Sequence, residues 1–132
     1  MINEIIKSKK KGINKYSQIN EALEDGVSPD ELDDRNTCAV FNAVSEKEVE
    51  VVELLLRKGA NPNIQDISGV TPLMKACLLN DQEIVNVLIE YYADPYLKQT
   101  RGNDAFYYDK TGLLDEFKVV ERLGTFRKFL NL

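Results

Sequence analysis

Residues 50–63 read EVVELLLRKGANPN, and residues 83–96 read EIVNVLIEYYADPY. The two stretches align without gaps at an offset of 33 residues, so that ANP falls on ADP and apolar residues fall on apolar residues. The same step backward places Gly26 on Gly59, and the same step forward from Gly69 reaches Gly102. Four blocks of this length fill the 132 residues. Self-similarity at such a period indicates a repeat architecture in which each unit packs on its neighbour.

The apolar residues within the blocks recur at the spacing of an amphipathic α-helix, which predicts one buried stripe per block. The two clearest stripes comprise Val49, Val52, Leu55 and Leu56, and then Ile84, Val85, Leu88 and Ile89. Gly59 follows the first stripe, where a left-handed helix cap needs a residue without Cβ. Thr71 and Pro72 are the expected N-cap and first residue of the next helix.

The period, and residues 69–89 (GVTPLMKACLLNDQEIVNVLI) in particular, resemble the ankyrin repeat. That family's pattern is a turn of D-x-x-G-x-T-P-L-H type, a short helix, a second helix of E-V-V-x-L-L-L type, and then G-A-D/N-x-N. Residues 66–73 (DISGVTPL) carry the turn, and residues 59–63 (GANPN) carry the end of the second helix. The match is strong over residues 34–95 and weaker over the first and last units, as end caps would be.

The resemblance implies a single-domain, all-α, ankyrin-like solenoid of about four stacked helix–turn–helix repeats joined by short β-turn or hairpin loops. The expected units are 1–33 as N-terminal cap repeat, 34–66, 67–99, and 100–132 as C-terminal cap repeat. In the last unit the apolar residues are expected to fold over the open end of the stack. They are Phe106, Tyr107, Tyr108, Phe117, Val120, Leu123, Phe126, Phe129 and Leu130.

Three departures from the family pattern carry structural expectations. Cys38 stands where the pattern has the capping threonine, so the cap hydroxyl is lost. The pattern has histidine at the positions of Phe41, Met74 and Tyr107. This predicts apolar packing there in place of the hydrogen bonds by which the family histidine connects neighbouring turns. Tyr92 stands where the second helix should be followed by glycine, so that helix end is expected to be less ideal.

The amino-acid composition disfavours several classes of function. With 17 basic and 22 acidic residues the net charge is −5, which disfavours contact with nucleic-acid phosphates. Histidine is absent, so the commonest general base and metal ligand are absent with it. Two cysteines are too few for a disulfide scaffold, and no stretch is apolar enough for a signal peptide or membrane helix. The expectation is a cytoplasmic protein without metal or cofactor, monomeric alone.

The residues with reactive side chains have structural explanations that we prefer to catalytic ones. Four acids lie within residues 30–34 (DELDD), but their spacing does not match a calcium loop, and such a turn is expected to face solvent. Cys77 falls at a core alanine position of the family pattern, and Cys38 lacks a histidine partner. No phosphate-binding glycine loop is present.

Charge is distributed unevenly along the chain. Residues 1–15 carry +4, residues 16–56 carry −9, and residues 57–132 balance. The lysines of the basic stretch could contact an anionic surface, but the preferred interpretation is a solvated face of the first helix pair. The acidic stretch is interpreted as a patch that attracts a basic partner and speeds its arrival.

The ankyrin resemblance implies that a partner protein contacts the turns and first helices, which form the concave face. Ile67, Val70, Leu78 and Leu79 are apolar there although the fold does not require it, and exposed apolar clusters rimmed by charge are typical of protein-binding sites. The alternative is that Leu78 or Leu79 turns inward to pack. The residues predicted to contact the partner are Asp33, Asp34, Arg35, Thr37, Glu46, Ile67, Ser68, Val70, Leu78, Leu79, Arg101 and Asn103.

Three functional hypotheses follow. The first is a non-catalytic module whose concave face binds a partner protein. The second is an immunity-type inhibitor, a small acidic protein that covers the active site of a basic enzyme such as a nuclease toxin. The third is an enzyme, against which the missing histidine and missing phosphate loop count.

Overall fold

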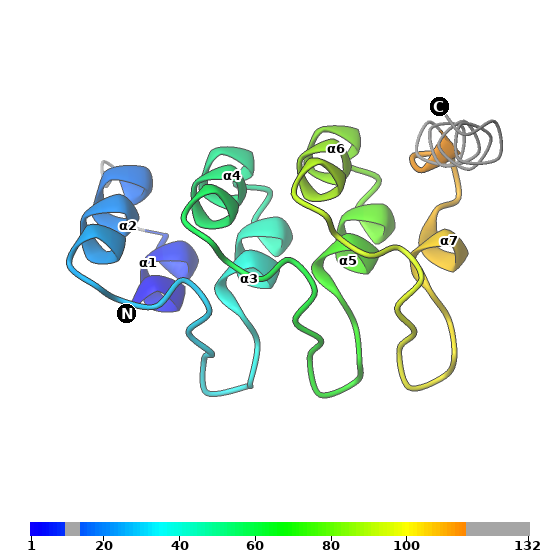
Figure 1. The fold of residues 1–132 in the computed structure, drawn as a ribbon, viewed down its shortest axis with the longest axis horizontal. Coiled ribbons are helices and arrows are strands. Elements are labelled where there is room, and N and C mark those ends of the chain that lie inside the picture. The colour runs from blue at the N-terminus through cyan, green and yellow to red at the C-terminus, as the bar shows by residue number, and fades with distance from the viewer. Residues whose placement is uncertain (10–13, 116–132) are drawn as a thin grey trace, which may run out of the picture.

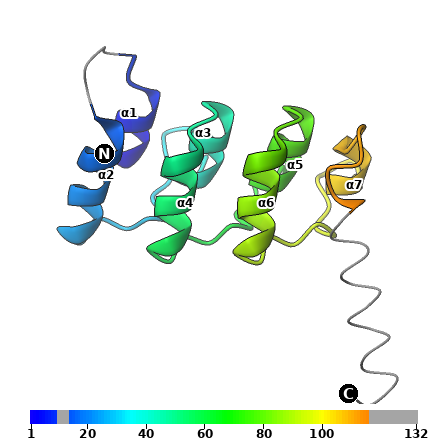
Figure 2. The ribbon, with the colours of Figure 1, turned by 90° about the horizontal axis from the view of Figure 1, so that it is seen from above.

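The computed structural model describes residues 1–9 and 14–115, which form helices arranged in two parallel rows (Figure 1). One row contains α1 (Ile2–Lys7), α3 (Ala39–Ser45), α5 (Pro72–Leu78) and α7 (Ala105–Tyr108). The other contains α2 (Lys15–Glu24), α4 (Val49–Arg57) and α6 (Gln82–Glu90). Successive helices alternate between the rows, so the chain advances by one helix pair at a time (Figure 2).

Each helix from α1 to α6 contacts both its own pair partner and the equivalent helix of a neighbouring pair. Helix α3 packs on α4 and also on α5, and α4 packs on α6. The described residues contain no β-strand, apart from an isolated bridge between Leu32 and Cys38. The all-α solenoid predicted from the 33-residue period is confirmed.

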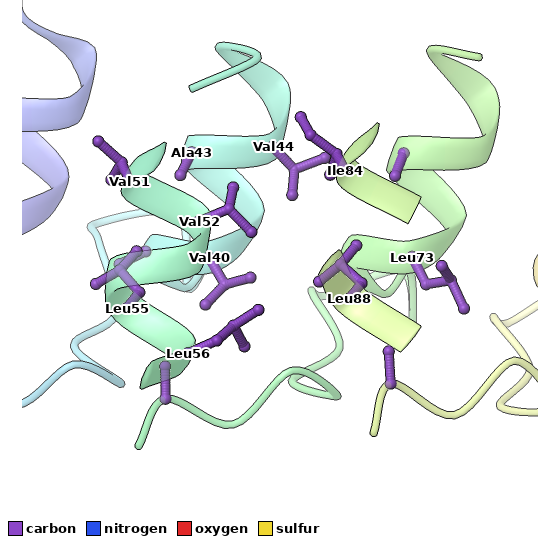
Figure 3. Packing of buried hydrophobic residues seen from close by; sticks show 14 of the residues in the cluster. Val40, Ala43, Val44, Val51, Val52, Leu55, Leu56, Leu73, Ile84 and Leu88 are labelled. Atoms are coloured by element: carbon purple, nitrogen blue, oxygen red, sulfur yellow. The ribbon is translucent and has the colours of Figure 1, made fainter. Parts of the chain in front are cut away.

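The core is the predicted apolar stripe, continued from one pair to the next. Val52, Leu55, Ile84 and Leu88 are all buried. Val44 of α3 points toward Ile84 of the neighbouring pair, so the core is shared between pairs rather than enclosed in each (Figure 3). Burying one such aliphatic side chain contributes about 2 kcal/mol. A single pair has no such neighbour, and stacking is therefore what makes the fold stable.

The helix ends follow the expected sequence signals. Thr71 caps α5 through its hydroxyl, which accepts the N–H of Met74 at 3.2 Å, and Pro72 is the first helical residue. Gly59 ends α4 with a φ of +93°. At α3 the expectation of a lost cap is only partly correct. The Sγ atom of Cys38 accepts the N–H of Phe41 at 3.4 Å, so sulfur replaces the missing hydroxyl.

Apolar packing replaces the family histidine at two of the three expected positions. Met74 is buried, and Phe41 is half-buried against the core. The expectation is wrong for Tyr107, which is 53% exposed and packs edge-on against Tyr108, with the Lys110 ammonium 4.5 Å above its ring. The apolar residues of the last unit from Phe117 onward lie outside the described residues, and the division into four units stays a prediction.

Tyr92 occupies a strained backbone position. Its φ is +68°, and its side chain is 88% exposed. Because the left-handed region is costly for residues with a Cβ, we expect Tyr92→Gly to raise the free energy of unfolding by roughly 0.5–1 kcal/mol. Urea denaturation measures this gain. Tyr92→Ala is the matched control, because it removes the ring but keeps the Cβ. An equal gain from alanine would contradict the backbone explanation.

Candidate functional site

Three loops project side by side from the edge formed by the first helices (Figure 1). We call them the first finger (residues 33–37), the second finger (66–70) and the third finger (99–103). Each finger is closed by the same two main-chain hydrogen bonds. In the second finger the N–H of Asp66 donates to the oxygen of Val70 at 3.0 Å, and the N–H of Gly69 donates to the oxygen of Asp66 at 2.8 Å.

The first residue of each finger also organises the turn with its side chain. The Oδ1 atom of Asp66 accepts the N–H groups of Ser68 and Val70, both at 2.9 Å. Asp33 does the same for Arg35 and Thr37, also at 2.9 Å, and Gln99 takes this role in the third finger. Short polar side chains satisfy turn N–H groups in this way, which fixes the finger shape.

Asp33 also joins the first finger to two helices. Its Oδ2 atom accepts from Lys7 Nζ at 2.5 Å and from Asn42 Nδ2 at 3.1 Å, so it joins α1, the first finger and α3. Its side chain is only 6% exposed. Burial opposes ionisation, but hydrogen bonds from Lys7, Thr37, Asn42 and Arg35 outweigh it and hold the pKa of Asp33 well below its usual range. The expectation that this acid faces solvent is wrong.

The other acids of residues 30–34 are also largely engaged within the chain. The Oδ1 atom of Asp30 accepts the N–H of Asn61 at 2.8 Å and ties one repeat to the next. Glu31 pairs with the amino terminus at 2.7 Å. Of this group, only Asp34 has an exposed side chain at a finger tip. The acids of residues 30–34 therefore mostly serve the fold, whereas seven of the eleven acids in residues 16–56 are exposed.

The basic N-terminal stretch and the acidic stretch after it are partners in three ion pairs. Besides Lys7–Asp33 and the amino terminus with Glu31, Lys15 Nζ lies 3.0 Å from Glu48 Oε1. A hollow of about 560 Å³ lies beside the first finger, and two of these ion pairs line it. The interpretation of a solvated face fits Lys7, whose side chain is 42% exposed, but not Lys15, whose side chain is 20% exposed. Lys10 and Lys11 lie outside the described residues.

The structure places the predicted partner-facing residues on the fingers and at the ends of the first helices. Asp34, Arg35, Ser68 and Arg101 are exposed on the fingers, and Glu46 is exposed at the end of α3. Thr37 and Asn103 are half-buried, and the side chain of Asp33 is almost fully covered. Except for Asp33, which serves the fold, these positions stay candidates for partner contact.

The four apolar candidates divide into two pairs. Ile67 is 84% exposed at the second finger, and Leu78 is 61% exposed at the end of α5. Val70 and Leu79 are half-buried and pack against the core. The alternative that a leucine turns inward therefore applies to Leu79, and Leu78 remains on the surface.

Neither thiol is set up as a nucleophile. Cys38 and Cys77 are both buried. Burial raises the pKa of Cys38, and burial together with the charge of Asp109 raises the pKa of Cys77 to about 12. Because the thiolate is the reactive form, both side chains are inert near neutral pH.

Within residues 1–9 and 14–115, no three His, Cys, Asp or Glu side chains are grouped so that they could hold a metal ion. Over the same residues, no helix has the length and apolar character needed to span a bilayer.

Sequence reasoning missed two residues that distinguish the first finger from the second. Asn36 stands where the second finger has Gly69, and Leu32, which is 48% exposed, stands where the next repeat has Gln65. The signal was present, because both differences appear when the chain is compared with itself at an offset of 33. Their meaning depends on how closely neighbouring fingers approach.

Comparison with known families identifies residues 8–99 with the family described as ankyrin repeats, in three copies. A segment of 57 residues, 43% of this chain, is 46% identical to an ankyrin repeat protein of Acanthamoeba polyphaga mimivirus and covers 14% of that protein. The whole chain is 26% identical to 17% of an ankyrin repeat protein of fowlpox virus (strain NVSL).

A second mimivirus ankyrin repeat protein is 33% identical over 86 residues, which make up 65% of this chain and 50% of that protein. The chain thus spans half or less of the length of these relatives. The family match covers well over half of the chain and agrees with the helix pairs and fingers described above.

Proposed function

The chain belongs to the ankyrin-repeat family, and from that premise we propose that it is a non-catalytic module that binds another protein through its fingers and first helices. This family is generally an interaction fold. The proposal that the partner binds the fingers and first helices is supported by the exposure of Ile67 and Leu78. The fold leaves these two large aliphatic side chains uncovered. Exposed apolar groups bordered by charge are typical of surfaces that another protein covers.

The charged residues around these two side chains suit a rim. Arg35 and Asp34 lie on the first finger, and Arg101 lies on the third. Rim charges mainly set the rate and specificity of association, whereas desolvated apolar anchors supply most of the affinity. We therefore expect Ile67 and Leu78 to carry more binding free energy than the charges beside them.

The double substitution Ile67→Asp and Leu78→Asp tests this proposal. We expect it to weaken capture of a partner from native lysate by about tenfold or more, because each aspartate places a charge where an apolar contact forms. Both positions are exposed, so the helical circular dichroism should not change. Capture is measured by co-purification on the immobilised chain.

Tyr92→Asp is the matched control, since it adds the same charge at an exposed side chain away from the fingers. Equal loss in the control would show a general effect of charge. Loss of helical circular dichroism in the double variant would show that the two residues belong to the core, and the proposed surface would then be misplaced.

The narrower hypothesis of an immunity-type inhibitor of a basic enzyme stays a prediction. This hypothesis rests on the acidic stretch 16–56. The ion pairs of Glu31, Asp33 and Glu48 within the chain reduce the charge that this stretch offers to a partner. A stoichiometric, salt-sensitive complex with a basic enzyme would support it. The monomeric state and the cytoplasmic location are likewise predictions.

A further inference from the structure

The hollow of about 560 Å³ beside the first finger is bounded on its other side by α1. The first finger and α1 are neighbours in the fold (Figure 1), and the ion pair between Lys7 and Asp33 joins them. Sites that hold a ligand or a partner's side chain are commonly hollows of about 300–1,000 Å³. Because the fingers and first helices form the face proposed to bind a partner, this hollow lies on that face.

The charged groups that line the hollow are four carboxylates and two ammonium groups. Glu31 pairs with the amino terminus at 2.7 Å, and Asp33 pairs with Lys7 at 2.5 Å. The other two carboxylates belong to Glu4 and Asp34, whose residues are exposed and which form no ion pair among the residues that the structure describes. Each ammonium group therefore already has its own acid, and two negative charges remain for a partner.

The hollow also has an apolar part, which two side chains provide. Leu32 is 48% exposed and Met1 is 61% exposed, and both line the hollow together with the acids. Lysine and arginine lay their methylene stems along apolar surface while their charged ends remain in a polar environment. A surface that offers aliphatic groups and unpaired carboxylates in one hollow matches both parts of such a side chain. An acidic side chain would be repelled, and a purely apolar one would leave the carboxylates without a partner.

The wall of the hollow is held in place by bonds within the chain. Glu31 accepts the N–H of Ile2 at 3.2 Å as well as the amino terminus, and its main-chain oxygen accepts from Asn3 Nδ2 at 3.1 Å. Asp33 is fixed by the hydrogen bonds described above. A wall that is already ordered loses little conformational entropy when a partner binds, which favours affinity.

We propose that this hollow binds a lysine or arginine side chain of a partner protein. The stem of that side chain packs on Leu32 and Met1, and its cationic group contacts the carboxylates of Glu4 and Asp34. This inference rests on the proposed protein-binding function, and it names the chemistry that the partner presents to the first finger.

Nuclear magnetic resonance locates the binding of short glycine–serine peptides that carry arginine. We expect the arginine peptide to shift the resonances of Glu4, Leu32 and Asp34 more than those of the exposed acids on α4 and α6. The matched peptide with glutamine in place of arginine should leave all of these resonances unchanged. The proposal would be overturned if the arginine peptide did not bind, if its shifts were spread evenly over all exposed acids, or if the glutamine peptide shifted the same residues.

The double variant Glu4→Gln and Asp34→Asn removes the two unpaired charges and keeps the size of both side chains. We expect it to bind the arginine peptide about fivefold less tightly, because exposed ion pairs each contribute modestly to affinity. Glu83→Gln with Glu90→Gln is the matched control, since it removes two charges from exposed positions on α6. Equal weakening in the control would show that net charge alone attracts the peptide, and the hollow would not be its site.

Capture of a partner from native lysate separates this inference from the proposed function. We expect Glu4→Gln/Asp34→Asn to weaken capture, as Ile67→Asp/Leu78→Asp does, while Glu83→Gln/Glu90→Gln leaves it intact. If Ile67→Asp/Leu78→Asp abolishes capture and Glu4→Gln/Asp34→Asn leaves it unchanged, the protein-binding function stands and this inference fails.

Discussion

Replacing Gly69 with alanine is expected to lower the free energy of unfolding by about 3 kcal/mol. Two costs add. The φ of +81° is unfavourable for any residue with a Cβ, which costs about 1 kcal/mol. The new Cβ would also lie 2.9 Å from the Cα of Gln99 and 3.2 Å from the nitrogen of Thr100, so the third finger must move away. That movement breaks the hydrogen bond from the Thr100 N–H to the Ser68 oxygen and the one from Gln65 Nε2 to the Lys98 oxygen, each contributing about 1 kcal/mol.

Gly59→Ala separates the two costs. Gly59 has a φ of +93°, but a Cβ there would meet no atom within 4 Å. Its replacement should cost only the backbone term of about 1 kcal/mol. Chemical denaturation of both variants gives the comparison. Equal losses would mean that the third finger does not depend on the close approach at Gly69.

Much of the fold could be predicted because its causes are local in sequence. Leu55 and Leu88 lie in apolar stripes of helical period, and they are buried at equivalent places in α4 and α6. Thr71 caps α5 as predicted, and Tyr92 adopts positive φ at the helix end that was expected to be less ideal. Each of these properties depends on a few neighbouring residues and on the repeat, and both are visible in the sequence.

The role of Asp33 could not be predicted because its charged partner, Lys7, is distant in the sequence. Lys7 lies 26 residues earlier, in a first unit whose short helix does not follow the pattern of the inner repeats. Charge sums along the chain showed a basic stretch followed by an acidic one. They did not show that the two stretches meet through the ion pair of Lys7 with Asp33.

The exposure of Tyr107 could not be predicted either, because the repeat pattern does not show where the stack of helix pairs ends. Its equivalent Met74 is buried between repeats, and the same position in the last unit is exposed. A repeat pattern assigns one environment to every copy, whereas burial depends on a following neighbour. The partner surface has the same limit: the sequence predicted exposure equally for Leu78 and Leu79, and only the direction of each side chain separates them.

Replacing Asp33 with alanine is expected to lower the free energy of unfolding at neutral pH by about 3 kcal/mol. The carboxylate accepts four hydrogen bonds, from Lys7, Arg35, Thr37 and Asn42, and its side chain is almost fully covered. Its removal leaves donors on three elements without their acceptor, and an unsatisfied buried donor costs about 1–3 kcal/mol. Asp34→Ala, at an exposed side chain one residue away, should change stability by no more than about 0.5 kcal/mol.

The pH dependence of the stability lost in Asp33→Ala shows whether the negative charge of the carboxylate, rather than the space its side chain fills, stabilises the fold. Because folding depresses the pKa of Asp33, its stabilisation is fully present above the unfolded value of about 4 and is lost as the pH falls below it. The difference between the unaltered chain and Asp33→Ala should therefore be largest at neutral pH and shrink in acid.

Asp33→Asn keeps an acceptor for the turn but no charge for Lys7, and should cost about 1 kcal/mol at neutral pH. Urea titrations at neutral pH and at pH below about 4 measure all three variants. A loss in Asp33→Ala that does not change between these conditions would show that the ionised carboxylate is not what holds α1, the first finger and α3 together.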